Sequence, residues 1–216
     1  MFTGIVEEIG TVESLTPTSE AYQLKIKASR ILEDVHLGDS IAVNGVCLTV
    51  TSFNQGEFSV DVMPETVKAS TIHTLSRGSS VNLERAMAAN GRFGGHFVAG
   101  HVDGVGKILS RTPLSNAVYY EIEVDPSLLH FMVNKGSITV DGTSLTLFEL
   151  TDHSFTISLI PHTLSETVLG QKDKGSLVNI ECDMMAKYIR KFIHPEQAVE
   201  KKSSLTPSFL EKHGFM

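Results

Sequence analysis

The sequence predicts an all-β protein made of two tandem, homologous, small antiparallel β-barrels followed by a C-terminal α-helix. Three observations carry this prediction: the chain repeats itself, each repeat consists of short alternating runs, and an amphipathic stretch follows the second repeat. The chain has 216 residues, of which 41% are hydrophobic and 20% are charged. This composition is typical of one large or two small globular domains.

The repeat is visible as segments that return at a nearly constant spacing. The run Ser40–Thr49 returns at Ser137–Thr146, and the run Phe58–Thr66 returns at Phe155–Thr163. Further matches join Gly78–Glu84 to Gly175–Glu181 and Thr3–Val6 to Ala99–Val102. A glycine-rich linker at Asn90–His96 separates the copies. We therefore expect domains at residues 1–96 and 97–186, followed by a helical oligomerisation segment and tail at 187–216.

Alternating apolar and polar residues predict the strands of each copy. In the first copy the runs are Ser40–Thr51, Glu57–Met63 and Ser80–Leu83, and each has a partner in the second copy. Short strands separated by turn residues are typical of an antiparallel barrel or sandwich, and a small barrel is the preferred interpretation. The segments Pro64–Leu75 and Pro161–Leu169 begin with proline and continue at helical spacing, which predicts one short helix per copy.

After the second copy, apolar residues recur every three or four positions and so form a stripe on one face of a helix. They are Met184, Met185, Tyr188, Ile189, Phe192 and Ile193. Two finished barrels leave little core for this helix to join, so we interpret it as an oligomerisation element, with packing on its own chain as the alternative. A further helix is expected between Thr206 and Gly214.

Composition excludes several classes of function. The formal net charge is −7 and Lys and Arg do not cluster, which argues against general nucleic-acid binding. The N-terminal MFTGIVEEIG resembles neither a secretory signal nor a membrane span, so we expect a cytoplasmic protein that binds no membrane. The two cysteines, Cys47 and Cys182, are too few for a disulfide framework or a zinc site, and the pair His96 and His101 lacks a zincin context. We expect no metal.

The two copies differ at six positions that matter chemically, because copies under the same packing constraints should diverge where their tasks differ. The pairs are Asn44 and Asp141, Cys47 and Ser144, Ile5 and His101, Glu65 and His162, Arg85 and Cys182, and Ala86 and Asp183. The second copy holds more groups that move protons, namely His101, Asp141, Ser144 and Asp183. Neutral drift on a duplicated scaffold is the alternative explanation.

The start MFTGIV, the pair NGVCLTV and DGTSLTL, the linker GGHFVAGHVDG and the late VNIE together resemble the alpha-type riboflavin synthases, a family with two lumazine-binding domains. The resemblance covers Met1 to about Arg190. It implies the dismutation of two 6,7-dimethyl-8-ribityllumazine molecules, by transfer of a four-carbon unit, to riboflavin and 5-amino-6-ribitylaminouracil. It implies no cofactor.

The same resemblance implies a homotrimer whose active site, with two substrate molecules, lies between the first domain of one subunit and the second domain of its neighbour. Lumazine synthase is a candidate partner. The alternative is a non-catalytic lumazine- or flavin-binding antenna protein, which would keep the ligand contacts of the first copy and could lose the polar groups of the second. In this chain the second-copy polar groups are present.

The resemblance also implies which residues form the site. We expect His101 to transfer protons, Ser144 to bond or add to the acceptor lumazine, Asp183 to orient that acceptor, and Cys47 to contact the ligand of the first copy. In the first copy the implied substrate contacts are Gly4, Ile5, Val6, Ser40, Cys47, Leu48, Thr49, Asp61, Val62, Met63, Pro64, Glu65 and Thr66. In the second copy they are Gly100, His101, Val102, Lys135, Ser144, Leu145, Thr146, Ile160, Pro161, His162, Thr163, Leu164 and Ser165.

Overall fold

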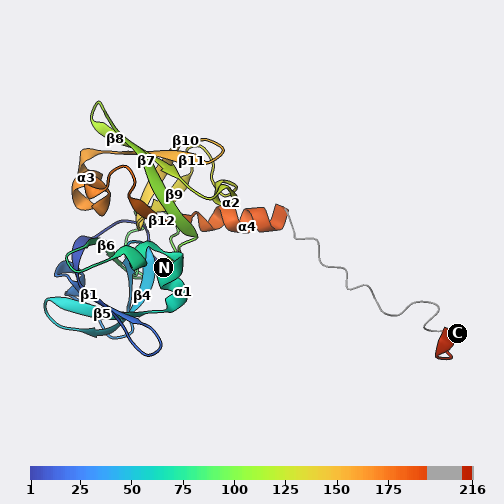
Figure 1. Ribbon diagram of the computed structural model, residues 1–216, viewed down its shortest axis with the longest axis horizontal. Coiled ribbons are helices and arrows are strands. Elements are labelled where there is room, and N and C mark those ends of the chain that lie inside the picture. Colours follow the sequence, from blue (N-terminus) through green and yellow to red (C-terminus); the bar gives the residue numbers. More distant parts are fainter. Residues whose placement is uncertain (194–210, 216) are drawn as a thin grey trace.

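The computed structural model, which describes residues 1–193 and 211–215, consists of two closed antiparallel barrels that lie side by side (Figure 1). The first barrel has the strand order β1-β2-β5-β4-β3-β6 and the second has the equivalent ring β7-β8-β11-β10-β9-β12. The first contains β1 (Glu8–Pro17), β2 (Tyr22–Lys27), β3 (Ser40–Val43), β4 (Val46–Phe53), β5 (Glu57–Val62) and β6 (Ser80–Arg85). The second contains β7 (Gly104–Leu114), β8 (Ala117–Glu123), β9 (Ser137–Val140), β10 (Thr143–Leu150), β11 (Ser154–Leu159) and β12 (Leu177–Cys182). The predicted fold class is confirmed.

Residues 1–193 contain four α-helices and a 3₁₀ turn at Arg30–Leu32, besides the two 3₁₀ turns given below. The α-helices are α1 (Pro64–Ala69), α2 (Pro126–Leu129), α3 (Pro161–Glu166) and the longer α4 (Met184–Ile193). The segments predicted as single helices at Pro64–Leu75 and Pro161–Leu169 each divide into an α-helix and a 3₁₀ turn, at Thr71–Thr74 and Val168–Gln171. The helix expected between Thr206 and Gly214 lies mostly outside the described residues, although Glu211 and Lys212 are helical.

The predicted strand Ser40–Thr51 is wrong in one respect, because it forms two strands joined by a tight turn. Asn44 and Gly45 have φ angles of 45° and 80°, the left-handed region required at both centres of a type I′ hairpin turn. Asp141 and Gly142 form the same turn between β9 and β10. A Cβ atom on Gly45 would lie 2.7 Å from the Gly142 nitrogen, so the two turns meet where only glycine fits.

Each barrel has its own apolar core. Phe58 fills the first core and its counterpart Phe155 fills the second, and both are fully buried. A third, small cluster of Phe2, Ala42 and Val98 lies where the segments before the two barrels meet. Phe2 and Val98 form an antiparallel bridge there, with N···O distances of 2.8 and 3.2 Å. The two barrels are therefore joined by a core of their own as well as by the linker.

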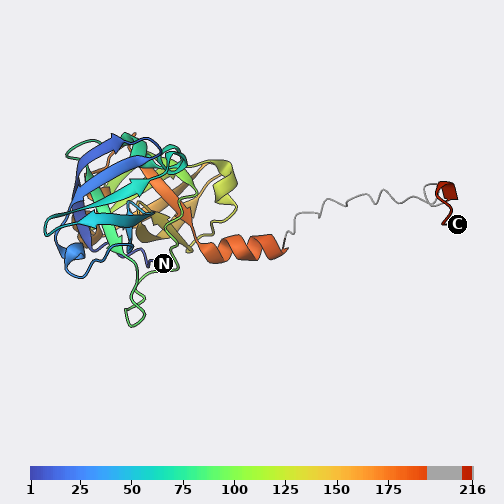
Figure 2. The same ribbon diagram turned by 90° about the horizontal axis from the view of Figure 1, so that it is seen from below.

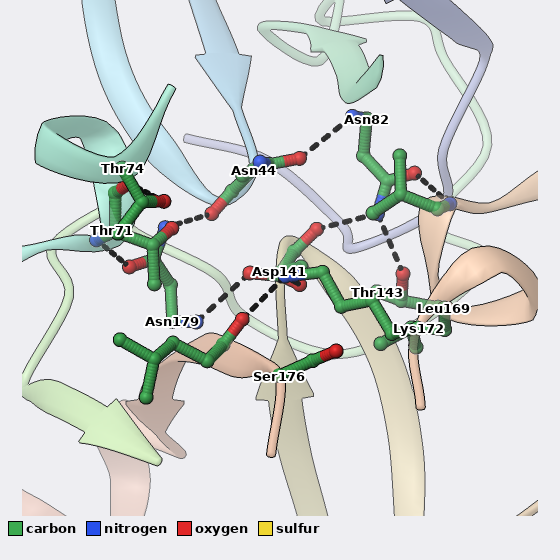
Figure 3. A network of polar contacts seen from close by, with 12 residues as sticks. Asn44, Thr71, Thr74, Asn82, Asp141, Thr143, Leu169, Lys172, Ser176 and Asn179 are labelled. Carbon is green, nitrogen blue, oxygen red and sulfur yellow. Dashed lines mark hydrogen bonds and ion pairs between the residues drawn. The ribbon is translucent and has the colours of Figure 1, made fainter. Parts of the chain in front are cut away.

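Buried asparagines fix the barrels to each other through matching hydrogen bonds (Figure 3). The Asn82 side chain donates to the Asp141 carbonyl (2.8 Å) and accepts from the Val168 N–H (2.8 Å). In the same way, Asn179 donates to the Asn44 carbonyl (2.8 Å) and accepts from the Thr71 N–H (2.7 Å). Asn82 and Asn179 are each about 1% exposed, so their amides bond to protein groups and not to water. The network therefore specifies one orientation of the two barrels relative to each other.

The paired asparagine bonds are symmetric, but the whole network is not: Asn82 also donates to Thr143 Oγ1 (3.4 Å), where the first barrel has Val46, and the second barrel adds an ion pair. Asp141 is fully buried, and its Oδ2 lies 2.8 Å from Lys172 Nζ, whereas the first barrel has Asn44 and Leu75 at the matching positions. Burial raises the pKa of the Asp141 carboxyl, an effect that the Lys172 ammonium opposes. The second barrel thus contains a charged pair where the first contains a neutral one.

We predict that Lys172→Leu alone lowers the free energy of unfolding by about 3–5 kcal/mol, because it leaves the Asp141 carboxylate buried without a cation. The double change Asp141→Asn, Lys172→Leu copies the first barrel and should unfold within about 1 kcal/mol of the wild type. Urea unfolding of the wild type, both single variants and the double variant measures this. A double variant as unstable as Lys172→Leu would contradict the prediction.

Helix α4 extends away from both barrels (Figures 1 and 2). No α4 side chain is fully buried, and Tyr188, Phe192 and Ile193 are exposed. The helix touches its own chain through an ion pair between Lys187 and Asp103 (2.5 Å) and through Arg190 above the ring of Phe131 (5.2 Å). Most of its apolar stripe is therefore without a covering surface in the single chain. Among the described residues, the helices are too short or too polar to cross a membrane.

Candidate active site

Two short segments that precede the barrels are held by buried glutamates. Glu84 at the end of β6 accepts hydrogen bonds from the N–H groups of Thr3 (2.7 Å) and Gly4 (3.0 Å). Glu181 at the end of β12 accepts from Ala99 (2.7 Å) and Gly100 (3.0 Å). Burial raises the pKa of both carboxyls, and the backbone donors oppose that rise. The two carboxylates therefore place Gly4 and Gly100 equivalently.

Each held segment then crosses to the opposite barrel. The Gly4 carbonyl accepts from the Ser144 N–H of β10 (2.7 Å), and the Gly100 carbonyl accepts from the Cys47 N–H of β4 (2.9 Å). Both glycines have positive φ, and a Cβ on either would lie within 2.7 Å of the facing side chain. The Gly4 carbonyl thus contacts the second barrel and the Gly100 carbonyl the first, while the neighbouring Ile5 lines a cavity on its own barrel.

The crossing brings a histidine of the linker onto Ser144. His96 Nδ1 lies 2.7 Å from Ser144 Oγ, and His96 Nε2 lies 3.1 Å from Thr139 Oγ1. The His96 N–H donates to the Thr3 carbonyl (3.1 Å), and the side chain is only 9% exposed. A neutral imidazole donates through one ring nitrogen and accepts through the other, so both hydroxyls are satisfied. In one of the two tautomers, Nδ1 accepts the Ser144 proton.

The charge state of His96 depends on burial and on one carboxylate. Burial lowers the pKa of the His96 imidazole, while the negative charge of Asp183 opposes this shift. Asp183 lies directly before α4, where its Oδ1 accepts from the Met185 N–H (2.9 Å). His96 is therefore neutral in the resting site, and Asp183 is placed to stabilise the imidazolium that forms when His96 takes a proton.

We predict that His96 makes stability depend on pH in one direction. The pKa of the His96 imidazole is lower in the folded than in the unfolded protein. The contribution of His96 to the free energy of unfolding is therefore complete above about pH 6.5, the ordinary pKa, and is lost as the pH falls from there through the folded pKa. Urea unfolding at about pH 7 and about pH 5.5 should show a smaller loss in His96→Gln than in the wild type. Equal losses in the two proteins would contradict this.

The structure separates the proton-moving groups that the sequence assigned to the second copy. His101 is exposed and directly follows Gly100, which bonds to Cys47, and the adjacent Val102 packs against the first core. Asp141 is committed to Lys172. Ser144 and Asp183 remain together near His96. His101 thus belongs to the surroundings of the half-buried Cys47 rather than to those of Ser144.

The other expected substrate contacts occupy matching places on the two barrels. Ser40 and Thr49 are directly opposite on β3 and β4, as are Ser137 and Thr146 on β9 and β10, and both threonines are exposed. The remaining first-copy contacts lie at the end of β5 and on α1: Asp61, Val62, Met63, Pro64, Glu65 and Thr66. Those of the second copy lie on or just before α3: Ile160, Pro161, His162, Thr163, Leu164 and Ser165.

Several of the apolar contacts, besides Val102, pack into or against the barrel cores. Leu48 and Val62 are in the first core, and Leu145 and Leu164 pack against the second. Leu48 and Val62 are buried and offer only backbone atoms to a ligand outside the barrel, whereas Leu145 and Leu164 are partly exposed. Ile5 and Ser40 line a cavity of about 380 Å³ between the chain start, β3 and the segment after β6, and Lys135 precedes β9 with its side chain exposed. The two barrels therefore present similar outer faces beside the crossing segments.

Sequence comparison of the two copies missed His96 as a partner of Ser144. Its matching position in the first copy would precede Met1, so no counterpart reveals it. The signal that was available is its place at the end of a glycine-rich linker, where Gly95 passes so close that a Cβ would lie 3.0 Å from Ser144 Oγ. Among the described residues, no three potential ligands cluster as a metal site.

Comparisons with known proteins agree with the duplicated fold. The family model described as the lumazine binding domain matches twice, at residues 3–86 and 99–183. The chain is 60% identical to the riboflavin synthase of Bacillus subtilis (strain 168) and 52% identical to that of Actinobacillus pleuropneumoniae, covering 100% of each pair. A solved structure of LumP complexed with 6,7-dimethyl-8-(1′-D-ribityl)lumazine is 26% identical, with a TM-score of 0.76 over 84% of this chain and 98% of the other.

Proposed function

The chain belongs to the riboflavin synthase family and carries two lumazine binding domains, and from this we propose that its barrels provide one half-site each for the two reacting molecules. The enzyme converts two molecules of 6,7-dimethyl-8-ribityllumazine into riboflavin and 5-amino-6-ribitylaminouracil by transferring a four-carbon unit. We assign the domains to residues 1–96 and 97–186 and the helical segment and tail to residues 187–216, although α4 itself already begins at Met184. A reaction between two like molecules suits two like barrels.

The first half-site is the outer face of the first barrel around Cys47 and Thr49, and it includes the crossing segment with His101 and Val102. The supporting observation is the 2.9 Å bond between Cys47 N–H and the Gly100 carbonyl, which holds that segment against β4. The second half-site is the matching face around Ser144 and Thr146, with the segment Gly4–Val6 and His96. Exposed threonine hydroxyls at matching strand positions suit the ribityl chains.

The observation that carries the chemical proposal is the 2.7 Å contact between Ser144 Oγ and His96 Nδ1. Removal of a 7-methyl proton leaves an anion that is delocalised into the pteridine carbonyls. Ser144 Oγ accepts this proton while its own proton passes to His96 Nδ1, and Asp183 stabilises the resulting imidazolium. His101, in the first half-site, returns protons to the other ring. This arrangement replaces the expected bond between Ser144 and the acceptor.

Positioning contributes more than proton transfer. A placed general acid or base accelerates a reaction by about 10²–10⁴, whereas holding two reactants in register reaches effective molarities of roughly 10⁵–10⁸ M. The half-sites must therefore face each other closely. We propose that they do so between subunits of a homotrimer in the cytoplasm, in which α4 supplies the contact, because its apolar stripe is uncovered in the single chain.

Complementation between subunits tests this proposal. Thr49→Arg and Thr146→Arg each place a bulky charge on one exposed half-site and should each abolish conversion of lumazine. When the two variant chains are unfolded together and refolded as mixed trimers, roughly a quarter of the wild-type activity should return, because some interfaces join two intact half-sites. Separately refolded chains, mixed afterwards, are the control. No recovery in mixed trimers would overturn the proposed site between subunits.

The second candidate function is that of a lumazine- or flavin-binding protein without activity, which the similarity to LumP with bound lumazine brings into consideration. The identity of 60% over the full length to a riboflavin synthase favours the enzyme. Incubation of the pure protein with the lumazine distinguishes the two. Riboflavin absorbance and fluorescence should rise with time, whereas binding without conversion would identify a carrier or antenna protein.

A further inference from the structure

Lys135 occupies a backbone conformation that its side chain makes costly. Its φ is 65°, and the matching residue in the first barrel is Gly38 with a φ of 89°. Both N–H groups make the same bond, to the carbonyls of Leu147 and Val50 respectively, at 2.9 Å. The turn is thus shared by both barrels, but only the second carries a lysine at a position where glycine is unstrained.

The lysine side chain is held by an aromatic pair. Lys135 Nζ lies 4.5 Å from the ring centroid of Phe148, which stands at a bulge in β10 and is 46% exposed. The Phe148 ring is in turn fixed edge-on by Tyr119 of β8, with centroids 5.3 Å apart and planes at 79°. Of the ion pairs within residues 1–193 and 211–215, none includes Lys135. The ammonium is therefore positioned by π-electrons and remains available to a ligand.

The first barrel has the opposite character at the matching places. Its β4 bulge carries Thr51 where the second barrel has Phe148. Conversely, exposed Asp61 on β5 matches the neutral Ser158 of β11. The first half-site thus has a carboxylate without the lysine, and the second has the lysine without the carboxylate. These two pairs of positions give a difference of two units of charge, and Glu65, which matches His162, makes the first face still more negative.

We propose that Lys135, positioned by Phe148, makes the second half-site the one that binds lumazine as the 7-methyl-deprotonated anion. The first half-site, with Asp61, binds the neutral molecule that this anion attacks. The Lys135 N–H bonds to Leu147 of β10, the strand that also carries Ser144 and Thr146. The cation and the proton acceptor therefore act on the same ligand. This inference rests on the proposed half-sites and assigns their unequal roles.

The experiment compares two probes in a chain whose first half-site is blocked by Thr49→Arg. The anionic probe is the lumazine analogue with a 7-oxo group in place of the methyl group, and the neutral probe is riboflavin. In this background, Lys135→Met should weaken the anionic probe about tenfold or more and riboflavin by less than about twofold. Phe148→Leu should produce a smaller loss of the same selective kind, and Phe148→Tyr should restore binding.

Lys174→Met, which removes one exposed charge from the turn before β12, is the matched control and should leave both affinities unchanged. Adding Thr146→Arg should abolish both probes. If both still bind that chain, the second half-site itself is wrong and the inference falls with it. If the double-arginine chain binds neither probe, the second half-site stands. If Lys135→Met then weakens the two probes equally or not at all, only the charge assignment is overturned.

Discussion

Ending the chain after Asp183 should reduce lumazine conversion at least about 10³-fold while both barrels remain folded. The reason is that α4 buries no side chain in the barrels but carries the exposed apolar stripe that we assign to the trimer contact. Without it each chain retains both half-sites and loses the neighbour that faces them. Sedimentation measures the oligomeric state, and steady-state fluorescence measures riboflavin formation.

Truncation also removes the ion pair between Lys187 and Asp103, so a second variant isolates the apolar stripe. Ile189→Glu with Phe192→Glu keeps the full chain and changes only exposed side chains. It should give the same monomer, with an unchanged unfolding midpoint and the same loss of activity. A monomer that turned over lumazine at the trimer's rate would show that the reaction needs only one chain.

Replacing His96 by alanine should lower kcat by about 10²–10³, because the Ser144 hydroxyl then has no base to receive its proton. Ser144→Ala should cause a loss of similar size. Since the two side chains act as one unit, the double variant should be little slower than either single variant. Single-turnover measurements of the chemical step, with riboflavin binding as a check on the site, provide the three values.

His96→Gln keeps most of the side-chain volume and a hydrogen bond to Ser144, so it separates proton transfer from packing. It should be nearly as slow as His96→Ala, with the stability of the wild type near neutral pH. His101→Ala is the comparison on the other half-site and should slow turnover while leaving activity above background. Fully additive losses for His96→Ala and Ser144→Ala would refute the coupled pair.

The internal repeat made most of the two-barrel architecture predictable from sequence. Elements outside the repeated segments, or hidden within them, were not predicted. The repeated runs revealed β5 and β6, and β3 with β4 as one run, because they combine alternation with turn residues. Strands β1 and β2 were not identified because they lie outside the repeated runs, although Tyr22, Leu24 and Ile26 of β2 alternate with polar residues. The Asn44–Gly45 turn was hidden inside an apparently continuous run. Recognising it required the strand pairing, which depends on closure of the barrel.

The candidate site was predictable where it lies on repeated strands and unpredictable where distant segments cross. Comparing the copies singled out Cys47, Ser144 and Asp183 by sequence alone. It could not show that His101 belongs beside Cys47, because the exchange of the two leading segments is a property of tertiary structure. The pairing of Asp141 with Lys172 was invisible for the same reason, as both residues reach each other only in the assembled second barrel.

The bridge between Phe2 and Val98 has a consequence for synthesis on the ribosome, where N-terminal domains are made and fold first. The opening residues reach their permanent neighbours only after β10 and the linker have emerged, since Gly4 bonds to Ser144. Until then Phe2, later fully buried, is exposed to water on the nascent chain. Affinity tags fused ahead of Met1 would extend from this junction, so tags on this enzyme belong at the other end.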